Sequence, residues 1–312
     1  TDTFGASPLR LKEFDFSKFD PSNFKAIPDQ LDLKTCSLES LTLELNIEGC
    51  RIAKRAIEKY RAQPDYDGRP LFVAGSIGPS NYVVSSTEAN LNKGTFGQIV
   101  ENFYHQVLGL IEGGADVLLI ETQQDILETK AIIEGANKAF AEKKKKLPII
   151  VQATVDVFSK MQIFNTDIHA AYTAVSKMGI DVFGINCNVG PDEMVETVKK
   201  LSRFCRHPIS VVPNAGQPIS EDGQTCYKLS PEDMANTMEP FVREHGVSIV
   251  GGCCGTTPNH IKALRKKLND VVPAPREPDK KVYVSGPQEA VPLDTSKGLL
   301  RIGERLNVRG SK

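Results

Sequence analysis

The sequence predicts an α/β protein built as a parallel (β/α)8 TIM-type barrel, and three observations lead to this prediction. Short runs that are apolar on both faces alternate with amphipathic helical patterns, as in a parallel sheet covered by helices. Six complete strand–helix units follow one another along the chain. Polar residues and cysteines gather at the carboxyl ends of the expected strands, where such barrels place their active sites. These strand-end residues are Ser76, Glu121, Thr154, Cys187, Asn214, Cys253 and Cys254.

A doubly wound sheet is the alternative fold. It would carry a glycine-rich phosphate-binding fingerprint directly after its first strand. The segment at that place reads Gly75-Ser76-Ile77-Gly78-Pro79 and does not fit this fingerprint. The barrel is therefore the preferred prediction.

The first 35 residues show little periodicity. Residues 1–5 are typical of the end of a strand that enters a loop, and the remainder of 1–35 is expected to be irregular. A helix is expected to begin after Ser37, which is a good N-cap, and to continue to about Arg61. Apolar residues recur at helical spacing across this segment. They include Leu41, Leu45, Ile52 and Ala56.

From residue 71 the strands and helices alternate. The expected strands are 71–76, 116–122, 148–154, 181–187, 209–215 and 247–254. The expected helices are 95–112, 126–143, 167–178, 192–204, 230–244 and 258–268. Ser230 is a good N-cap, and Pro231 suits the first helical position that follows it.

The chain changes character after residue 268. Residues 269–297 contain scattered prolines and no period, which predicts a linker. Residues 298–312 resume a strand pattern and are expected to open a second domain. The first domain is accordingly assigned to residues 1–268.

Composition limits the classes of function. The chain has 312 residues with 40% hydrophobic content, enough for one large core, and its net charge of -1 argues against a nucleic-acid partner recognised by bulk charge. No run approaches the roughly 18 apolar residues of a membrane span, and the start shows no signal-peptide pattern. Seven cysteines, an odd number with one adjacent pair, fit a reducing compartment. We expect a soluble cytoplasmic protein.

The most informative stretch is 250–258, where two adjacent cysteines lie among glycines. Neighbouring residues of a regular strand point to opposite faces, so Cys253 and Cys254 can face one point only if the backbone leaves strand geometry. The flanking glycines permit this departure. Cys187 ends another apolar run. Three thiols at two strand ends predict a zinc site with three protein ligands and an open fourth position. Buried, inert cysteines are the alternative interpretation.

The remaining candidate ligands are assigned other roles. Asp125 is expected to cap a helix rather than bind a ligand. His260 is expected to be a surface histidine, and the five histidines show no metal-binding spacing. The other cysteines lie on helix or loop patterns and are interpreted as structural. They are Cys36, Cys50, Cys205 and Cys226.

Three motifs carry a resemblance to a known family. Residues 251–258 (GGCCGTTP), together with 184–187 (GINC) and 213–216 (PNAG), resemble the homocysteine S-methyltransferase family. Residues 302–311 look like the opening of a methyltetrahydrofolate (pterin-binding) domain, and this order of domains is similar to that of the cobalamin-dependent methionine synthases. The resemblance implies a zinc-bearing barrel. It also implies that the first strand–helix unit and most of the second strand are absent from this chain.

The implied reaction is methyl transfer to the sulfur of homocysteine, which gives methionine. Methylcobalamin on another domain would be the donor, recharged from 5-methyltetrahydrofolate. Cys187, Cys253 and Cys254 would act as zinc ligands at the catalytic centre. Three thiolates on Zn²⁺ give a net charge of about -1, which suits an electron-rich sulfur nucleophile better than hydrolysis.

Two further residues are candidates for substrate binding. Glu121 is expected to bind the homocysteine ammonium, since an amino-acid ligand needs an anion near its amine. A surface or helix-entry carboxylate is the alternative for this residue. Asn214 is expected either to donate its amide oxygen to zinc when substrate is absent or to hydrogen-bond its own loop.

Two alternative functions stay open. One is a related homocysteine methyltransferase that uses betaine or S-methylmethionine as donor, against which the folate-domain pattern at 302–311 argues. The other is a non-catalytic zinc- or thiol-binding module. A closed structural zinc site needs a fourth protein ligand at tight spacing, and the sequence offers no convincing candidate.

Overall fold

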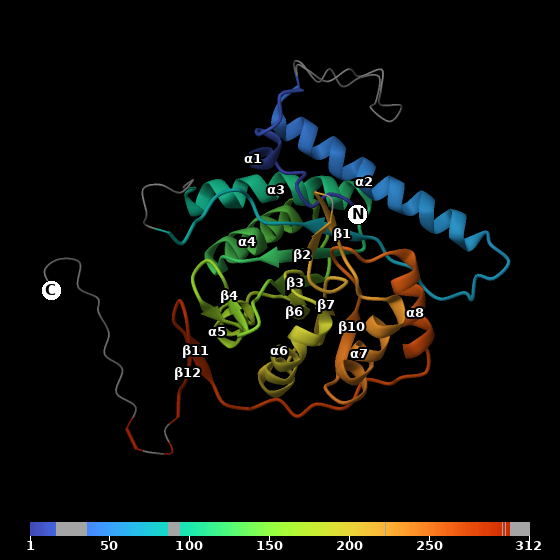
Figure 1. Cartoon of the computed structure of the whole chain (residues 1–312). Coiled ribbons are helices and arrows are strands. Elements are labelled where there is room, and N and C mark those ends of the chain that lie inside the picture. The colour runs from blue at the N-terminus through green and yellow to red at the C-terminus, as the bar shows by residue number, and fades with distance from the viewer. Residues whose placement is uncertain (17–35, 87–93, 222, 295, 297, 300–312) are drawn as a thin grey trace, which may run out of the picture.

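A six-stranded parallel sheet forms the centre of the molecule (Figure 1). The computed structural model describes residues 1–16, 36–86, 94–221, 223–294, 296 and 298–299. The strands pair in the order β1-β2-β3-β6-β7-β10, and every neighbouring pair is parallel. Their bounds are Ala74–Ile77 (β1), Val117–Gln123 (β2), Ile149–Ala153 (β3), Val182–Asn186 (β6), Ile209–Val212 (β7) and Val247–Val250 (β10).

Each of these six strands leads into a helix, as the sequence predicts. The helices after the strands are α3 (Phe96–Gly113), α4 (Ile126–Lys143), α5 (Ile168–Val175), α6 (Pro191–Phe204), α7 (Pro231–Arg243) and α8 (Pro258–Leu268). A short α1 (Pro8–Leu11) and the long α2 (Leu38–Arg61) precede β1. The alternation confirms the predicted parallel α/β architecture. Among the described residues, no helix combines the length and apolar character needed to cross a membrane.

The helix boundaries follow from local capping chemistry. The Ser37 hydroxyl accepts a hydrogen bond from the backbone N–H of Ser40 at the start of α2. Thr95 and Gln98 form a capping box at the start of α3. Helix α3 ends at Gly113 and is followed by the capping residue Gly114, whose φ of 82° is the left-handed conformation that glycine tolerates best.

The first residues of the chain run beside β1, which lies at one edge of the sheet. The Thr1 amino group donates to the Ala74 carbonyl over 2.7 Å, and the Thr3 hydroxyl donates to the Ser76 carbonyl over 2.8 Å. The buried Gln106 amide on α3 donates to the Thr3 carbonyl over 2.7 Å. Residues 1–3 therefore lie along β1 without forming an assigned strand, and β10 forms the other edge of the described sheet.

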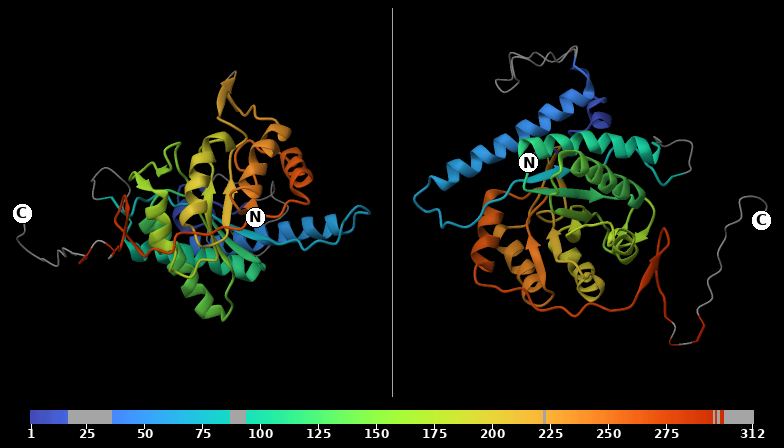
Figure 2. Two further views of the ribbon diagram at one scale, coloured as in Figure 1. Left: turned by 90° about the horizontal axis from the view of Figure 1, so that it is seen from below. Right: turned by 180° about the vertical axis from the view of Figure 1, so that it is seen from behind.

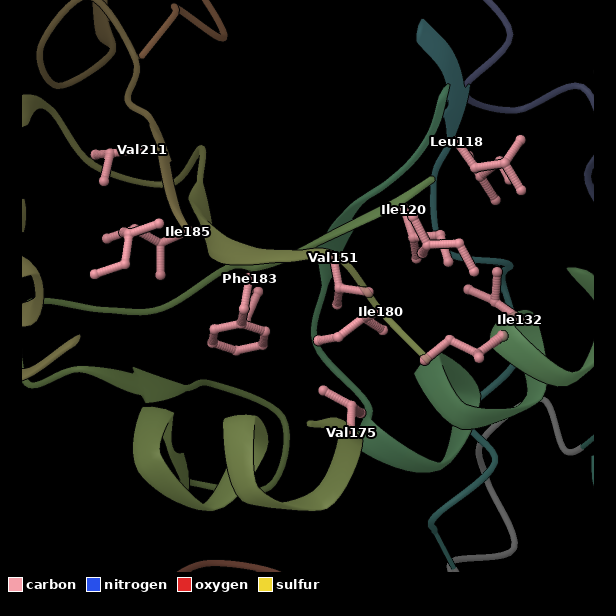
Figure 3. Close-up of a cluster of buried hydrophobic side chains, with 14 of the residues drawn as sticks. Leu118, Ile120, Ile132, Val151, Val175, Ile180, Phe183, Ile185 and Val211 are labelled. Atoms are coloured by element: carbon pink, nitrogen blue, oxygen red, sulfur yellow. The ribbon is translucent and has the colours of Figure 1, made fainter. Parts of the chain in front are cut away.

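The two faces of the sheet differ in character. The outer face packs its apolar side chains against the helices, as Figure 3 shows for Val151 and Phe183 above the segment that carries Val175. Burying each side chain of this size contributes about 1.5–3 kcal/mol to stability. Alternation along the strands places polar residues on the inner face. They are Ser76, Glu121, Gln152, Asn186 and Ser210.

In the part of the chain that the structure describes, three hairpins lie outside the predicted strand–helix pattern. They are β4–β5 (Lys160–Met161 with Thr166–Asp167), β8–β9 (Ile219–Glu221 with Gln224–Cys226) and β11–β12 (Tyr283–Ser285 with Ala290–Pro292). The β8–β9 hairpin precedes α7 and projects from the body in the left view of Figure 2.

The segment that follows α8 packs along the outside of the helical layer. The backbone N–H of Ala274 donates to the Val242 carbonyl over 3.0 Å, and that of Asp279 donates to the Arg203 carbonyl over 2.8 Å. The segment then reaches α5 through the β11–β12 hairpin (Figure 1). The predicted start of a pterin-binding domain, residues 298–312, lies outside the described residues except for 298 and 299.

Candidate metal centre and substrate site

Three cysteine sulfurs meet at the carboxyl ends of β6 and β10. Sγ of Cys254 lies 3.8 Å from Sγ of Cys187 and 4.0 Å from Sγ of Cys253, and all three atoms lie within 4.8 Å of one another. Zinc–sulfur bonds of about 2.3 Å in tetrahedral geometry place sulfur atoms about 3.8 Å apart. The spacing of the cluster therefore suits a single ion of this size. Cys187 and Cys253 are half-buried, and Cys254 is exposed.

The two adjacent cysteines lie on a turn after β10, not within the strand. Strand β10 ends at Val250, four residues before the predicted end of this strand. The backbone N–H of Cys253 donates to the Pro213 carbonyl over 2.8 Å, and the Cys254 carbonyl accepts from the Ala215 N–H over 2.9 Å. These bonds tie the turn to the segment that follows β7, so that both side chains reach the same point.

Cys187 reaches the cluster through an uncommon backbone conformation. Cys187 and Asn188 have φ values of 61° and 67°, in the left-handed region that side chains other than glycine rarely adopt. The Cys187 N–H still donates to the Val212 carbonyl over 3.0 Å, which keeps the residue beside β7. Strain of this kind is found at functional sites, where the surrounding structure maintains it.

The three thiols have pKa values that are shifted in different directions. A hydrogen bond from Cys253 is the main cause that lowers the pKa of Cys187 to about 6. The same bond, followed by burial, raises the pKa of Cys253, and burial is the main cause that raises the pKa of Cys254. Cys187 is therefore the most acidic of the three thiols, because hydrogen bonds from its neighbours favour its thiolate. A bound dication would deprotonate all three.

Asn214 connects the two loops that carry the cysteines. Its Oδ1 accepts a hydrogen bond from the backbone N–H of Cys254 over 3.1 Å, and its side chain also hydrogen-bonds Cys187. The residue is buried. The amide oxygen therefore binds the loop in this structure, whereas its role as a metal ligand in the absence of substrate stays a prediction.

Glu121 lies on β2 and faces the same end of the sheet. Its Oε1 accepts a hydrogen bond from the Ser76 hydroxyl over 2.6 Å, and its Oε2 lies 3.4 Å from Nδ2 of Asn186. Burial raises the pKa of the Glu121 carboxyl, and the bond from Ser76 partly opposes that effect. The arrangement leaves a half-buried carboxylate beside the cysteine cluster.

Two residues at the site had no predicted role. Asn186 belongs to the GINC motif, is fully buried and places its Nδ2 3.9 Å from the Cys253 sulfur. Tyr227 follows β9, and its pKa is raised by burial and then by the charge of Cys254 and a hydrogen bond to it. Asn186 could have been noticed as a polar residue in an apolar run. Tyr227 lies 27 residues before Cys254, just after an exposed hairpin, so the sequence offers no comparable sign.

The residues expected to have structural roles mostly have them. Asp125 caps α4 by accepting a hydrogen bond from the Leu127 N–H over 2.8 Å. Cys50 and Cys205 are buried. The prediction that His260 lies on the surface was wrong: it is 6% exposed, accepts from the Thr257 N–H at the start of α8 and contacts the Leu229 carbonyl with its Nε2. The capping hydrogen bond directs the imidazole ring of His260 toward the protein interior.

The family follows from a comparison of the whole first domain. A family model described as homocysteine S-methyltransferase matches residues 1–268. This chain belongs to the homocysteine S-methyltransferase family. It is 34% identical over 299 residues to the methionine synthase of Mycobacterium tuberculosis and 34% identical over 305 residues to that of Mycobacterium leprae. Each match covers 93% of this chain but 24% of the relative, so the chain spans about a quarter of the length of these curated relatives.

Solved structures of the homocysteine methyltransferase MmuM from Escherichia coli share the fold. The oxidised form superimposes with a TM-score of 0.62 at 19% sequence identity, covering 86% of this chain and 78% of that one. The metallated form gives the same TM-score and coverage at 20% identity. This likeness supports the predicted barrel-type architecture for the homocysteine S-methyltransferase domain described here.

Proposed function

We propose that this chain transfers a methyl group from methylcobalamin to the thiolate of homocysteine and so forms methionine. The observation that carries the proposal is the three-sulfur cluster at the strand ends, with the Glu121 carboxylate next to it. Membership of the homocysteine S-methyltransferase family and the similarity to methionine synthases support it.

The donor set of the cluster suits zinc. Cys187, Cys253 and Cys254 offer three soft sulfur ligands at the spacing that one tetrahedral ion requires, and no further His, Cys, Asp or Glu among the described residues completes the group. A free alkyl thiol has a pKa near ~8.5 and is mostly protonated at neutral pH. When bound, Zn²⁺ would hold the homocysteine sulfur as a thiolate at the fourth position.

The protein side chains would bind and orient the substrate. The three cysteine thiolates outweigh the charge of the ion, so that the substrate sulfur keeps its electron density for attack on the methyl group. Glu121 would accept hydrogen bonds from the homocysteine ammonium, while the Ser76 hydroxyl fixes one of its oxygens. Asn214 would hold the two cysteine loops together.

The donor chemistry would come from other parts of a longer protein. We assign cobalamin and 5-methyltetrahydrofolate to separate domains, residues 269–297 to the linker and 298–312 to the start of the pterin-binding domain. The relatives of which this chain covers 24% are named methionine synthases, which supports this assignment. A cytoplasmic location agrees with the free cysteines of the cluster.

A donor comparison tests the proposal. Zinc-loaded protein is incubated with homocysteine and, in parallel, with methylcobalamin, betaine or S-methylmethionine, and methionine is quantified by mass spectrometry. We expect methionine with methylcobalamin, and its loss in the Cys254→Ala variant. Methionine formed only with betaine or S-methylmethionine would assign the chain to the related enzymes. Homocysteine binding without methionine from any donor would indicate the non-catalytic module.

A further inference from the structure

Asn186 lies between the two groups that would hold opposite ends of homocysteine. It is the last residue of β6 and is fully buried. Its Nδ2 lies 3.4 Å from Oε2 of Glu121 and 3.9 Å from Sγ of Cys253. One amide nitrogen therefore contacts both the carboxylate assigned to the substrate ammonium and a sulfur assigned to the metal.

Asn186 is itself held by Thr122. Its Oδ1 accepts from the Thr122 N–H over 2.8 Å, and its Nδ2 donates to the Thr122 hydroxyl over 2.8 Å. Thr122 has a φ of 61°, a conformation that a β-branched residue avoids unless its surroundings impose it. Because Thr122 directly follows Glu121, this pair of hydrogen bonds fixes the direction in which the Glu121 side chain leaves β2.

A third strand completes the arrangement. The Thr154 hydroxyl, just after β3, donates to the backbone carbonyl of Asn186 over 2.9 Å. The ends of β2, β3 and β6 are thus joined at one buried residue. These few buried contacts therefore determine the position of the Glu121 carboxylate relative to the cysteine cluster.

We propose that Asn186 is a positioning residue that sets the spacing between the Glu121 carboxylate and the metal-binding sulfurs, and thereby selects homocysteine over cysteine. This inference rests on the proposed function and deepens it. Oε2 of Glu121 and Sγ of Cys253 can lie no further apart than about 7 Å, because both contact the same nitrogen. Homocysteine has two methylene groups between its α-carbon and sulfur and cysteine has one, so a fixed spacing suits one chain length.

Two variants and one control separate this role from general support of the fold. Asn186→Ala removes both contacts. Thr122→Val keeps the shape of residue 122 and its N–H but loses the hydroxyl that accepts from Nδ2. Asn102→Ala is the matched control. Asn102 lies on α3 and is 4% exposed, and its Oδ1 accepts a hydrogen bond from the Leu9 N–H over 2.8 Å.

The measurement is isothermal titration of the zinc-loaded proteins with three thiols: homocysteine, cysteine and 4-mercaptobutanoate, which is homocysteine without its amine. A missing methylene changes affinity by roughly 10- to 200-fold in a fitted site, which is the wild-type preference expected for homocysteine over cysteine. In Asn186→Ala we expect homocysteine affinity to fall by roughly 2- to 12-fold, the effect of one hydrogen bond. The ratio of homocysteine affinity to cysteine affinity should decrease as well.

Affinity for 4-mercaptobutanoate and the zinc content should stay unchanged in Asn186→Ala. Thr122→Val should also reduce the preference for homocysteine over cysteine, but by less than Asn186→Ala. Asn102→Ala should lower the melting temperature without altering this preference. If Asn186→Ala does not fold, Thr122→Val carries the test.

An unchanged homocysteine preference in the folded variants would overturn the inference. Equal weakening of all three thiols together with loss of zinc would also overturn it, because Asn186 would then support the metal cluster alone. Wild-type protein that takes up zinc but binds no homocysteine would refute the proposed function, and this inference with it.

Discussion

Cys187 and Cys205 lie on either side of α6, and the pKa values of their thiols are shifted in opposite directions. Cys205, at the carboxyl end of α6, is fully buried, and burial raises its pKa to about 12. Cys187, just after β6, has its pKa lowered to about 6 by hydrogen bonds, chiefly from Cys253. A thiol on the helix side of the sheet is an inert core residue, whereas a thiol at the carboxyl end of a strand has neighbours that favour its thiolate. Position relative to the sheet, and not residue type, therefore separates the cysteines proposed as metal ligands from those in the core.

Zinc binding should distinguish the three cluster cysteines from Cys205. Cys187→Ala, Cys253→Ala and Cys254→Ala should each lose stoichiometric zinc, and Cys205→Ala should keep it while unfolding at a lower temperature. Loss of a ligand should weaken zinc binding by more than the roughly 10- to 100-fold caused by loss of an outer-shell partner. Metal analysis after gel filtration and chelator competition measures both. A cluster variant that retains full zinc would show that its cysteine is not a ligand.

Two glutamates extend the comparison to carboxylates. Glu121 and Glu128 both have a raised pKa because of burial, and a serine hydroxyl donates to each, but only Glu121 lies beside the cysteines. Glu121→Gln should lower homocysteine affinity by about 10- to 150-fold, since a hydrogen bond to a charged group contributes roughly 1.5–3 kcal/mol. Glu128→Gln should leave this affinity unchanged. Zinc content should be full in both variants.

A thiol without an amine provides the second control for Glu121. Binding of 4-mercaptobutanoate should not weaken in Glu121→Gln, and equal weakening of both thiols would remove the substrate-pairing role. The pH dependence has a defined sign. Because burial raises the pKa of Glu121, its charge is lost as pH falls through a value above the ordinary 4.5, and homocysteine affinity should fall with it. The decrease should be less steep in Glu121→Gln, which keeps only the part that comes from proton release by the homocysteine thiol.

Two glycines test the turn that carries the cysteines. Gly255 and Gly223 have nearly the same φ, 77° and 76°, so alanine strains the backbone equally at both. An added Cβ at Gly255 would lie 2.2 Å from Cγ of Tyr227, whereas one at Gly223 would meet nothing within 4 Å. Gly255→Ala should therefore destabilise the zinc-loaded protein by about 1–3 kcal/mol more than Gly223→Ala.

Urea unfolding of the two glycine variants, with zinc affinity from chelator competition, measures the difference. The excess should become smaller when Gly255→Ala is combined with Tyr227→Ala, which removes the obstructing ring but leaves the Cβ of residue 227, 2.6 Å from the added atom. Equal destabilisation by the two single variants would show that Tyr227 yields easily and does not hold the turn.

Much of the fold could be predicted because its signals are local. Helix α4 has the predicted bounds, with the buried stripe inward and Asp125 as its cap. Strand β10 is shorter than predicted, because its ladder ends at Val250 and the glycines then turn the chain. The β8–β9 hairpin escaped prediction because its residues are mostly exposed and carry no apolar alternation.

The site could be predicted only in part for a different reason. The sequence places Glu121 and the cysteines at strand ends, where a parallel sheet brings them to one edge. It does not give their spacing, which depends on contacts between residues far apart in the chain. Asn186 and Glu121 are 65 residues apart, and Asn186 and Cys253 are 67 residues apart. Such contacts follow from strand register and side-chain direction, which no local pattern records.

In the proposed function, the three cysteines leave one metal position for the sulfur of homocysteine. Zinc-edge X-ray absorption of the loaded protein, recorded with and without homocysteine, tests it most directly. We predict three sulfur neighbours at about 2.3 Å without homocysteine and four when it is added, with no increase for homoserine, in which a hydroxyl replaces the thiol. A count that stays at three in the presence of saturating homocysteine, or that is already four without it, would contradict the account.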